Sequence, residues 1–139
     1  VIRQFEKKKT AYCIGRIFST TNKDQKNNYL IPDLKQRIKN SNKKILLKNL
    51  NHFRDFVSMS DITRVIFKLY KKKYKGIVNI ASGKKIYLKN IAKIILRKYK
   101  KKHYEFIDNK EQTYLVGDTK KLNEITNLRI KDPIEKLIF

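Results

Sequence analysis

Residues 10–18 are apolar almost throughout, and this run limits the folds that the chain can adopt. A strand with one face in water alternates apolar and polar residues, whereas a strand of a parallel sheet is covered on both faces and stays apolar. Cys13 lies inside the run, so we expect it to be a buried core thiol. The run therefore predicts a parallel sheet and, with it, an α/β fold.

A second segment, residues 54–62, predicts a short strand that leads directly into a helix. Phe56 and Val57 favour the strand. Ser58 and Ser60 are both candidate N-caps of the helix. Apolar residues then recur at helical spacing, which predicts that one face of the helix is buried. These residues are Ile62, Val65, Ile66 and Leu69.

Arg54 stands at the end of this strand, beside the N-terminus of the predicted helix. A guanidinium in that place can hold a phosphate, because its planar donors lie next to the positive end of the helix dipole. A structural ion pair with Asp55 or Asp61 is the alternative. Asp61 and Asp118 each stand at the start of a predicted helix, so we expect them to be helix caps rather than catalytic acids.

Four segments also carry a family resemblance, and together they cover nearly the whole chain. They are GRIFS (15–19), RDFVSMSD (54–61), VNIASG (78–83) and GDTKKL (117–122). In this order they resemble the LRLFN, RDFV-x-V-x-D, YNIGSG and ADTSKL segments of the extended short-chain dehydrogenase/reductases, which are NAD-dependent nucleotide-sugar epimerases and dehydratases.

The resemblance implies an α/β fold that combines the C-terminal end of a Rossmann-type parallel sheet with a small α/β substrate-binding domain. Residues 1–22 would end the Rossmann-type domain. Residues 23–139 would form the substrate-binding portion, with 77–81 returning to the Rossmann sheet. The ligand implied is a nucleotide-diphosphate sugar.

The same resemblance implies three substrate-binding residues: Ser19, Asn28 and Arg54. Ser19 stands where the family usually has Asn, and its hydroxyl can still donate or accept a hydrogen bond. Alternatively, Ser19 belongs to a polar loop whose hydroxyls only satisfy backbone groups. Asn28 precedes a segment similar to the family's NLIP, where Pro32 fits the first turn of a helix that ends near Lys39.

Catalysis in this family needs a glycine-rich turn for the dinucleotide pyrophosphate and a Tyr-x-x-x-Lys pair for proton exchange. None of the eight tyrosines has a lysine four residues later, and the four glycines are too far apart for such a turn. Residues 1–9 match the tail of the helix that carries the pair. We therefore expect a C-terminal fragment without catalytic or cofactor-binding residues, inactive on its own.

The parent enzyme implied by the resemblance would bind NAD or NADP in an N-terminal Rossmann half, and would dimerise chiefly through helices of that half. We do not expect this chain alone to hold the cofactor. Whether the parent is an epimerase, a dehydratase or a reductase stays open.

The remaining elements follow from local patterns. Residues 45–47 and 52–57 predict two arms of a hairpin around a turn at 49–51, where Asn can adopt a positive φ. Residues 77–81 and 104–107 predict strands, and 88–95 an amphipathic helix. Leu122 and Ile125 indicate a short helix. Asp132 and Pro133 predict the N-cap and first position of a last helix.

The formal charge of +23 comes from 35 Lys and Arg against 12 Asp and Glu. Most of these positive charges are lysines. This composition indicates a solvated surface more than a nucleic-acid-binding protein, because the recognition of bases relies mainly on arginine. A small basic nucleic-acid-binding protein stays the alternative from another class, and a noncatalytic sugar-nucleotide-binding protein is a third reading. His52 and His103 have no ligand cluster at metal spacing, so no metal site is expected.

No apolar stretch approaches the length of a membrane span, and no signal peptide is visible. These observations predict a cytoplasmic protein.

Overall fold

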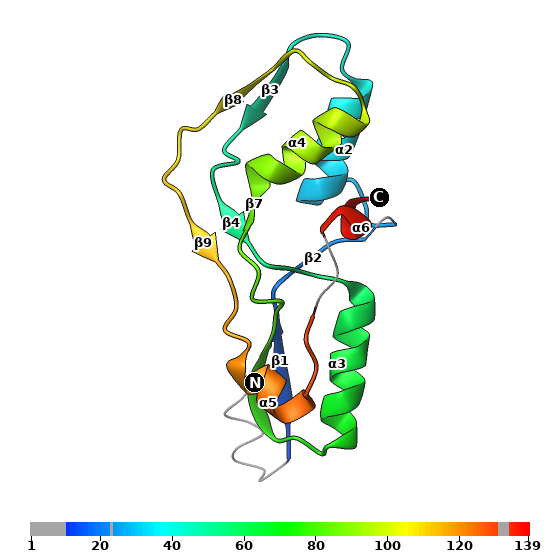
Figure 1. Cartoon of the computed structure of the whole chain (residues 1–139), viewed down its shortest axis with the longest axis vertical. Coiled ribbons are helices and arrows are strands. Elements are labelled where there is room, and N and C mark those ends of the chain that lie inside the picture. The colour runs from blue at the N-terminus through cyan, green and yellow to red at the C-terminus, as the bar shows by residue number, and fades with distance from the viewer. Residues whose placement is uncertain (1–10, 23, 131–133) are drawn as a thin grey trace.

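The computed structural model describes residues 11–22, 24–130 and 134–139, and these residues form an elongated molecule with a hydrophobic core near each end (Figure 1). One core gathers buried residues of segments 57–80 and 122–130. The other gathers buried residues of segments 31–56, 88–96 and 137–138. Short strands connect the two ends. The arrangement is mixed α/β with several parallel strand pairs, as the sequence predicts.

The lower end in Figure 1 is built on one parallel strand pair. β1 (Cys13–Ile17) pairs with β6 (Gly76–Ile80) in a register that runs from Cys13 opposite Gly76 to Ile17 opposite Ile80. The helices α3 (Met59–Lys71) and α5 (Lys120–Thr126) pack beside β6. The strand predicted at 77–81 is therefore present and lies next to β1.

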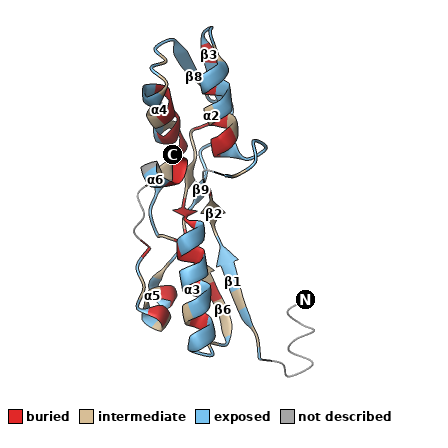
Figure 2. Ribbon diagram, turned by 90° about the vertical axis from the view of Figure 1, so that its right-hand side faces the viewer, coloured by how far each residue is buried: buried red, intermediate tan, exposed pale blue. Residues whose placement is uncertain are grey.

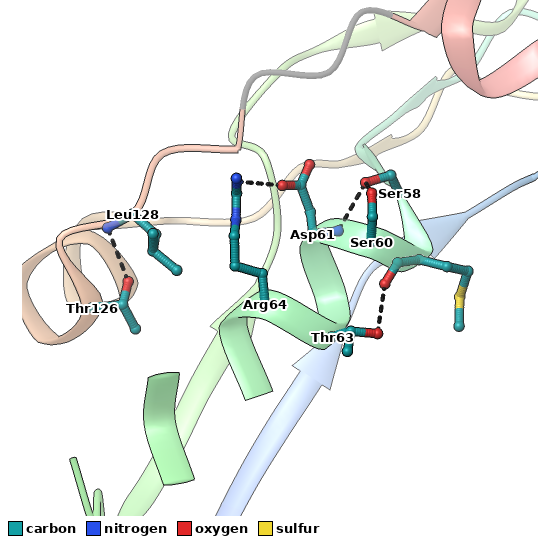
Figure 3. Close-up of polar contacts among 8 residues, drawn as sticks. Ser58, Ser60, Asp61, Thr63, Arg64, Thr126 and Leu128 are labelled. Atoms are coloured by element: carbon teal, nitrogen blue, oxygen red, sulfur yellow. Dashed lines mark hydrogen bonds and ion pairs between the residues drawn. The ribbon is translucent and has the colours of Figure 1, made fainter. Parts of the chain in front are cut away.

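The helix α3 begins as the sequence predicts, with Ser58 as its N-cap. The Ser58 hydroxyl accepts a hydrogen bond of 3.0 Å from the Asp61 N–H, and Asp61 lies in the first turn (Figure 3). This bond satisfies one of the backbone donors that a helix start leaves unpaired. Arg64 then reaches back to Asp61, with Nη2 at 2.5 Å from Oδ1.

Three of the four apolar residues expected on the buried face of α3 are buried: Ile62, Val65 and Leu69. The fourth prediction is wrong, because the side chain of Ile66 is 50% exposed. Ile66 lies on the side of α3 that borders a groove next to β1. No layer of the described residues covers that side of the helix.

The expectation that the apolar run at 10–18 is buried on both faces is also wrong for its described part, residues 11–18. β1 is exposed along most of its length (Figure 2). Cys13 is an exposed free thiol. The reason is that β1 has only one neighbour, β6, among the strands of the described residues. An apolar strand sequence indicates burial only when other strands and helices are present to cover it.

A groove of about 610 Å³ runs between β1 and α3. Apolar and aromatic side chains dominate its walls, which include Cys13, Ile17, Ile66, Leu69, Tyr70 and Ile80. Ile17, Ile66 and Tyr70 are among the large hydrophobic residues most exposed to water. This side of the molecule therefore carries a contiguous apolar surface, which is unusual for the outside of a protein.

The upper end is an α/β unit. β3 (Ile45–Lys48) pairs in parallel with β8 (Tyr104–Ile107), and Ile45 and Leu47 alternate toward the core. The helices α2 (Leu30–Asn40) and α4 (Leu88–Lys98) pack there, together with the short α6 (Ile134–Ile138). The helices predicted at 32–39 and 88–95 are thus confirmed.

The predicted hairpin of residues 45–57 is wrong. The turn exists, and Asn49 does adopt a positive φ of 54°. After it, however, Leu50 inserts into the upper core and the chain leaves β3. β4 (Phe53–Arg54) pairs instead with β7 (Ile86–Tyr87) and β9 (Tyr114–Leu115).

Ser19 belongs to a strand rather than to the predicted polar loop. β2 (Ser19–Thr20) pairs in parallel with β5 (Phe56–Val57), which sets Ser19 opposite Phe56. The helical assignment of residues 1–9 and the capping roles of Asp132 and Pro133 lie outside the described residues. The domain division at residue 22 stays a prediction.

Candidate functional site

Two of the three predicted site residues, Ser19 and Arg54, line one cavity of about 320 Å³. The cavity lies where β2 and the segment after it meet the start of α2 and the strands β4 and β5. The polar and aromatic residues of its wall are Ser19, Thr20, Thr21, Gln25, Tyr29, Arg54 and Phe56. The parallel pairing of β2 with β5 brings these distant segments together.

Arg54 is held at this cavity by contacts along β4 and toward β9. Its Nη1 donates hydrogen bonds to the Phe53 carbonyl at 2.7 Å and to the Thr113 hydroxyl at 3.0 Å. Both contacts involve the same nitrogen and neutral acceptors, and among the described residues no carboxylate forms an ion pair with this guanidinium. A phosphate in the cavity would supply the missing negative charge.

The alternative role for Arg54 was an ion pair with Asp55 or Asp61. Neither ion pair occurs among the described contacts. Asp61 pairs with Arg64, as described above. Asp55 accepts hydrogen bonds from Ser82, Gly83 and Gly117.

Asn28 lies apart from Ser19 and Arg54. It is an exposed turn residue shortly before α2, and it does not contribute to the wall of the cavity, although Tyr29 and Leu30 do. The structure thus brings together Ser19 and Arg54 but not Asn28. Its role in binding stays a prediction.

Thr21 is a residue of the cavity that the sequence did not single out. Its side chain is 1% exposed, and its hydroxyl has no hydrogen-bond partner among the described residues. Leaving such a group unpaired costs about 1–3 kcal/mol. Thr21 contributes to the cavity wall, but its hydroxyl oxygen is itself shielded from solvent. The Ser-Thr-Thr-Asn sequence alone does not indicate which of its hydroxyl groups is buried without a hydrogen bond.

Asp55 is a second residue that sequence reasoning missed. Its side chain is fully buried, and it lies between β4, the central strand of the three-stranded sheet, and the buried β5. Its carboxylate accepts hydrogen bonds from three backbone N–H groups. Two belong to the turn after β6 and one belongs to residue 117. Asp55 is thus a structural anchor that fixes the strand carrying Arg54.

Asp118 does what the sequence predicts for a residue at a helix start. Its Oδ1 accepts a 2.9 Å hydrogen bond from the Lys120 N–H, at the first residue of α5. The formal N-cap position belongs to Thr119, one residue later.

The largest of these cavities, about 760 Å³, lies between two loops at the far end of the upper unit. Lysines dominate its wall, at positions 43, 44, 100, 101 and 102, with His103 beside them. Two of these lysines already have partners, since Lys44 pairs with Glu105 and Lys101 donates to the Ser41 carbonyl. This is a basic surface of the kind that attracts polyanions nonspecifically.

The fold and the cavity have counterparts among known proteins. A family model described as the NAD dependent epimerase/dehydratase family matches residues 1–81. The chain belongs to this family. No curated protein matches the chain.

Solved structures with this epimerase/dehydratase fold are close in shape but distant in sequence. RMD from Pseudomonas aeruginosa, complexed with NADPH, has a TM-score of 0.83 and 14% identity; the match covers 99% of this chain and 49% of that one. The dTDP-glucose 4,6-dehydratase of Bacillus anthracis, in complex with NAD, has a TM-score of 0.82 and 16% identity, with coverage of 99% and 45%.

A third similar structure is the UDP-N-acetylglucosamine 4-epimerase of Methanobrevibacter ruminantium M1, in complex with UDP-N-acetylmuramic acid. It has a TM-score of 0.80 and 19% identity, and the match covers 99% of this chain and 47% of that one. The chain thus spans about half the length of these structures. Together they confirm the expected fold class, the end of a Rossmann-type sheet with a small α/β unit.

The glycines of this epimerase/dehydratase-family chain do not fit a dinucleotide site. A pyrophosphate cradle needs several glycines within one turn at a helix N-terminus. Here Gly15 lies within β1 against Ile80, and Gly117 lies against Ala81 and Phe18. Gly76 and Gly83 adopt positive φ at separate places. No reaction step through NAD(P) is therefore assigned to the residues of this chain.

Within residues 11–22, 24–130 and 134–139, no group of three or more His, Cys, Asp or Glu side chains is arranged to hold a metal ion. In the same part of the chain, no helix combines the length and the apolar character that crossing a membrane requires.

Proposed function

We propose that this chain is the nucleotide-sugar-binding portion of an NAD(P)-dependent epimerase, dehydratase or reductase, working in the cytoplasm. The observation that carries the proposal is the single cavity shared by Ser19 and Arg54, which come from two segments far apart in the sequence. The cavity combines a guanidinium for phosphate with hydroxyl groups and an aromatic ring for a sugar or base. Solved structures of similar fold bind NAD, NADPH or a UDP-sugar.

In this proposal the cofactor and the Tyr-x-x-x-Lys pair belong to an N-terminal Rossmann half that is absent from the 139 residues. That half would add its strands to the free edge of β1 and cover the apolar groove between β1 and α3. The exposed Ile17, Ile66 and Tyr70 support this placement, because large apolar residues of a stable domain are normally covered. The chain alone then binds ligand but does not turn it over. Dimerisation would be a property of the complete enzyme.

The test is a calorimetric titration of the 139-residue chain with UDP-glucose, dTDP-glucose and GDP-mannose. At least one is expected to bind, and Arg54→Ala is expected to weaken that binding about tenfold or more, as loss of a charged hydrogen bond does. Arg54→Lys should retain only part of the wild-type affinity, because an ammonium group cannot make a bidentate contact.

Arg97→Ala is the matched control for this titration. Arg97 is exposed on α4 and its Nε donates only to a backbone carbonyl of its own helix, so the substitution removes the same charge away from the cavity. Equal effects of the two alanine variants would mean that overall charge, not the cavity, drives binding. That outcome overturns the proposal.

The lysine-lined cavity of the upper unit is the observation that favours the alternative, a small basic nucleic-acid-binding protein. Single-stranded DNA that binds at 150 mM salt, and is lost when Lys43 and Lys102 are changed to Gln, would favour it. We expect binding only at low salt, with a steep decline as salt rises. Arg54→Ala should leave that weak binding unchanged.

Catalysis is tested separately. The 139-residue chain, mixed with NADPH and a 4-keto nucleotide sugar, is expected to show no oxidation of NADPH above background. Turnover by the chain alone would contradict the assignment of catalysis to another segment.

A further inference from the structure

The guanidinium of Arg54 ends a short chain of hydrogen bonds that passes through Thr113 to His52. Nη1 of Arg54 donates to the Thr113 hydroxyl at 3.0 Å, and the same hydroxyl lies 3.0 Å from Nδ1 of His52. The backbone N–H of Thr113 also donates to Nδ1, at 3.2 Å. Thr113 stands directly before β9, 59 residues after Arg54, and the pairing of β4 with β9 brings the two together.

The backbone N–H of Thr113 fixes the direction of these hydrogen bonds. A backbone N–H only donates, so Nδ1 of His52 is an acceptor and the ring proton lies on Nε2. The Thr113 hydroxyl therefore donates its one hydrogen to Nδ1. Its oxygen then accepts from Arg54, since a guanidinium has donors but no acceptor. His52 thus sets the Thr113 hydroxyl as an acceptor toward Arg54.

The protein contacts of Arg54 occupy one nitrogen of its guanidinium. Nη1 donates to the Phe53 carbonyl and the Thr113 hydroxyl, and the Thr113 carbonyl lies 3.5 Å away. Among the described residues, no acceptor forms a hydrogen bond with Nε or Nη2. Side by side, these two nitrogens can bind two oxygens of one phosphate. Arg54 is half-buried and lines the cavity, so the donors that a bidentate contact needs are left for a ligand.

A guanidinium that is held before the ligand arrives binds more tightly than a free one. A free arginine side chain samples many rotamers, and fixing it on binding costs free energy. The contact with Thr113 meets part of that cost during folding. Because the hydroxyl is neutral, it restrains the guanidinium without cancelling the charge that attracts a phosphate, as a carboxylate in its place would do.

We propose that Thr113 is a positioning residue for phosphate binding, which holds Nη1 of Arg54 while Nε and Nη2 bind the phosphate of a nucleotide sugar. His52 assists by fixing the Thr113 hydroxyl as an acceptor. This inference rests on the proposed function, because it takes phosphate binding by Arg54 as given. Thr113 and His52 act through Arg54 and do not themselves bind the ligand.

The experiment compares Thr113→Val, which keeps the branched shape of threonine without its hydroxyl, with Thr113→Ser, which keeps the hydroxyl. The 139-residue chain is titrated calorimetrically with UDP-glucose, dTDP-glucose and GDP-mannose. For each of these that the wild-type chain binds, Thr113→Val is expected to weaken binding about threefold to tenfold, the cost of ordering one long side chain. Thr113→Ser should keep the wild-type affinity.

Thr63→Val is the matched control. Thr63 is exposed on α3, and its hydroxyl donates to the Met59 carbonyl of the same helix, away from the cavity. Its substitution should leave the affinity unchanged. His52→Phe removes the acceptor at Nδ1 and is expected to weaken binding less than Thr113→Val does, because the Thr113 hydroxyl can still accept from Arg54. A larger loss for His52→Phe would contradict this order of action.

The same substitution in the Arg54→Ala chain separates positioning from a general effect on the fold. Positioning acts through the guanidinium, so Thr113→Val is expected to cause no further loss of affinity once Arg54 is replaced. A distortion of the fold would weaken binding to a similar extent in both backgrounds. That outcome overturns the inference.

Two further results would also overturn it. If Thr113→Val binds as the wild type does while Arg54→Ala is weakened, Thr113 does not position Arg54 and the proposed function still stands. If Thr113→Ser is weakened as much as Thr113→Val, the hydroxyl is not the group that acts. If the wild-type chain binds none of the three nucleotide sugars, the proposed function falls and this inference falls with it.

Discussion

The carboxylate of Asp55 receives two hydrogen bonds from Ser82, one from its backbone N–H at 2.8 Å and one from its hydroxyl at 2.6 Å. The second carboxylate oxygen receives the N–H groups of Gly83 at 2.8 Å and Gly117 at 3.1 Å. A single buried side chain thus ties the strand before α3 to the turn after β6 and to the segment before α5. These contacts fix the strand that carries Arg54.

Asp55→Asn is expected to lower the free energy of unfolding by about 3 kcal/mol. An amide keeps the size of the side chain, but it turns an NH₂ donor toward backbone N–H donors and leaves them unpaired. Urea denaturation followed by circular dichroism measures the change. Asp118→Asn is the control, because Asp118 is exposed and its substitution should cost at most about 0.5 kcal/mol. Equal stability of the two variants would contradict the anchoring role of Asp55.

Ser58→Ala is expected to destabilise the protein by about 1 kcal/mol, because the Asp61 N–H loses its capping acceptor. Ser60→Ala provides the comparison, since Ser60 is exposed and its hydroxyl forms a hydrogen bond with that of Ser58 rather than with the backbone N–H of Asp61. It should change stability by a few tenths of a kcal/mol. The cap assignment fails if the Ser60 variant is the less stable of the two in thermal unfolding.

Gly117→Ala is expected to cost about 2 kcal/mol, because the new methyl group would lie 2.2 Å from the Cβ of Ala81 and 3.1 Å from the ring of Phe18. The double variant with Ala81→Gly removes the closer of these clashes. A double-mutant cycle in urea should therefore show a positive coupling between the two positions. Simple additivity would mean that the chain moves apart at Gly117 instead.

Cys13 is expected to react fully with iodoacetamide without denaturant, because its side chain is exposed. The reaction at pH 8 should nevertheless be slower than that of a short cysteine peptide. Desolvation in the apolar groove raises the pKa of the Cys13 thiol, so the reactive thiolate forms only at a higher pH. The pH profile of the labelling rate, measured by mass spectrometry, gives the midpoint. The rate in guanidinium chloride is the reference, and it should match the peptide.

The parts of the fold that could be predicted depend on residues close together in sequence. Ser58 marks the start of α3 because a cap and its helix are neighbours, and the spacing from Ile62 to Leu69 marks the buried side. The partner of β3 could not be found in the same way. Residues 45–57 contain two strands and a turn, yet β3 pairs with β8, and no local pattern records which distant strand supplies the better core.

The residues of the candidate site also fall into those that could be predicted from the sequence and those that could not. Ser19 and Arg54 were expected from the family resemblance, and the pairing of β2 with β5 places them at one cavity. Thr21 and Asp55 were missed, because their importance comes from burial and from hydrogen bonds to segments far along the chain. Cys13 was misjudged for the opposite reason: an apolar sequence gives no information about whether a covering layer is present.

The parallel pairing of β1 with β6 also affects how the chain folds. About 60 residues separate the paired strands, so the pairing of β1 with β6 forms only after α3 and β6 have been synthesised and have come back to β1. Closing such long loops before any strand contact forms slows folding, in contrast to proteins built from local hairpins. During synthesis the edge of β1 that pairs with β6 therefore stays unpaired until about 60 further residues have been made, and an unpaired strand edge of this kind can associate with other chains.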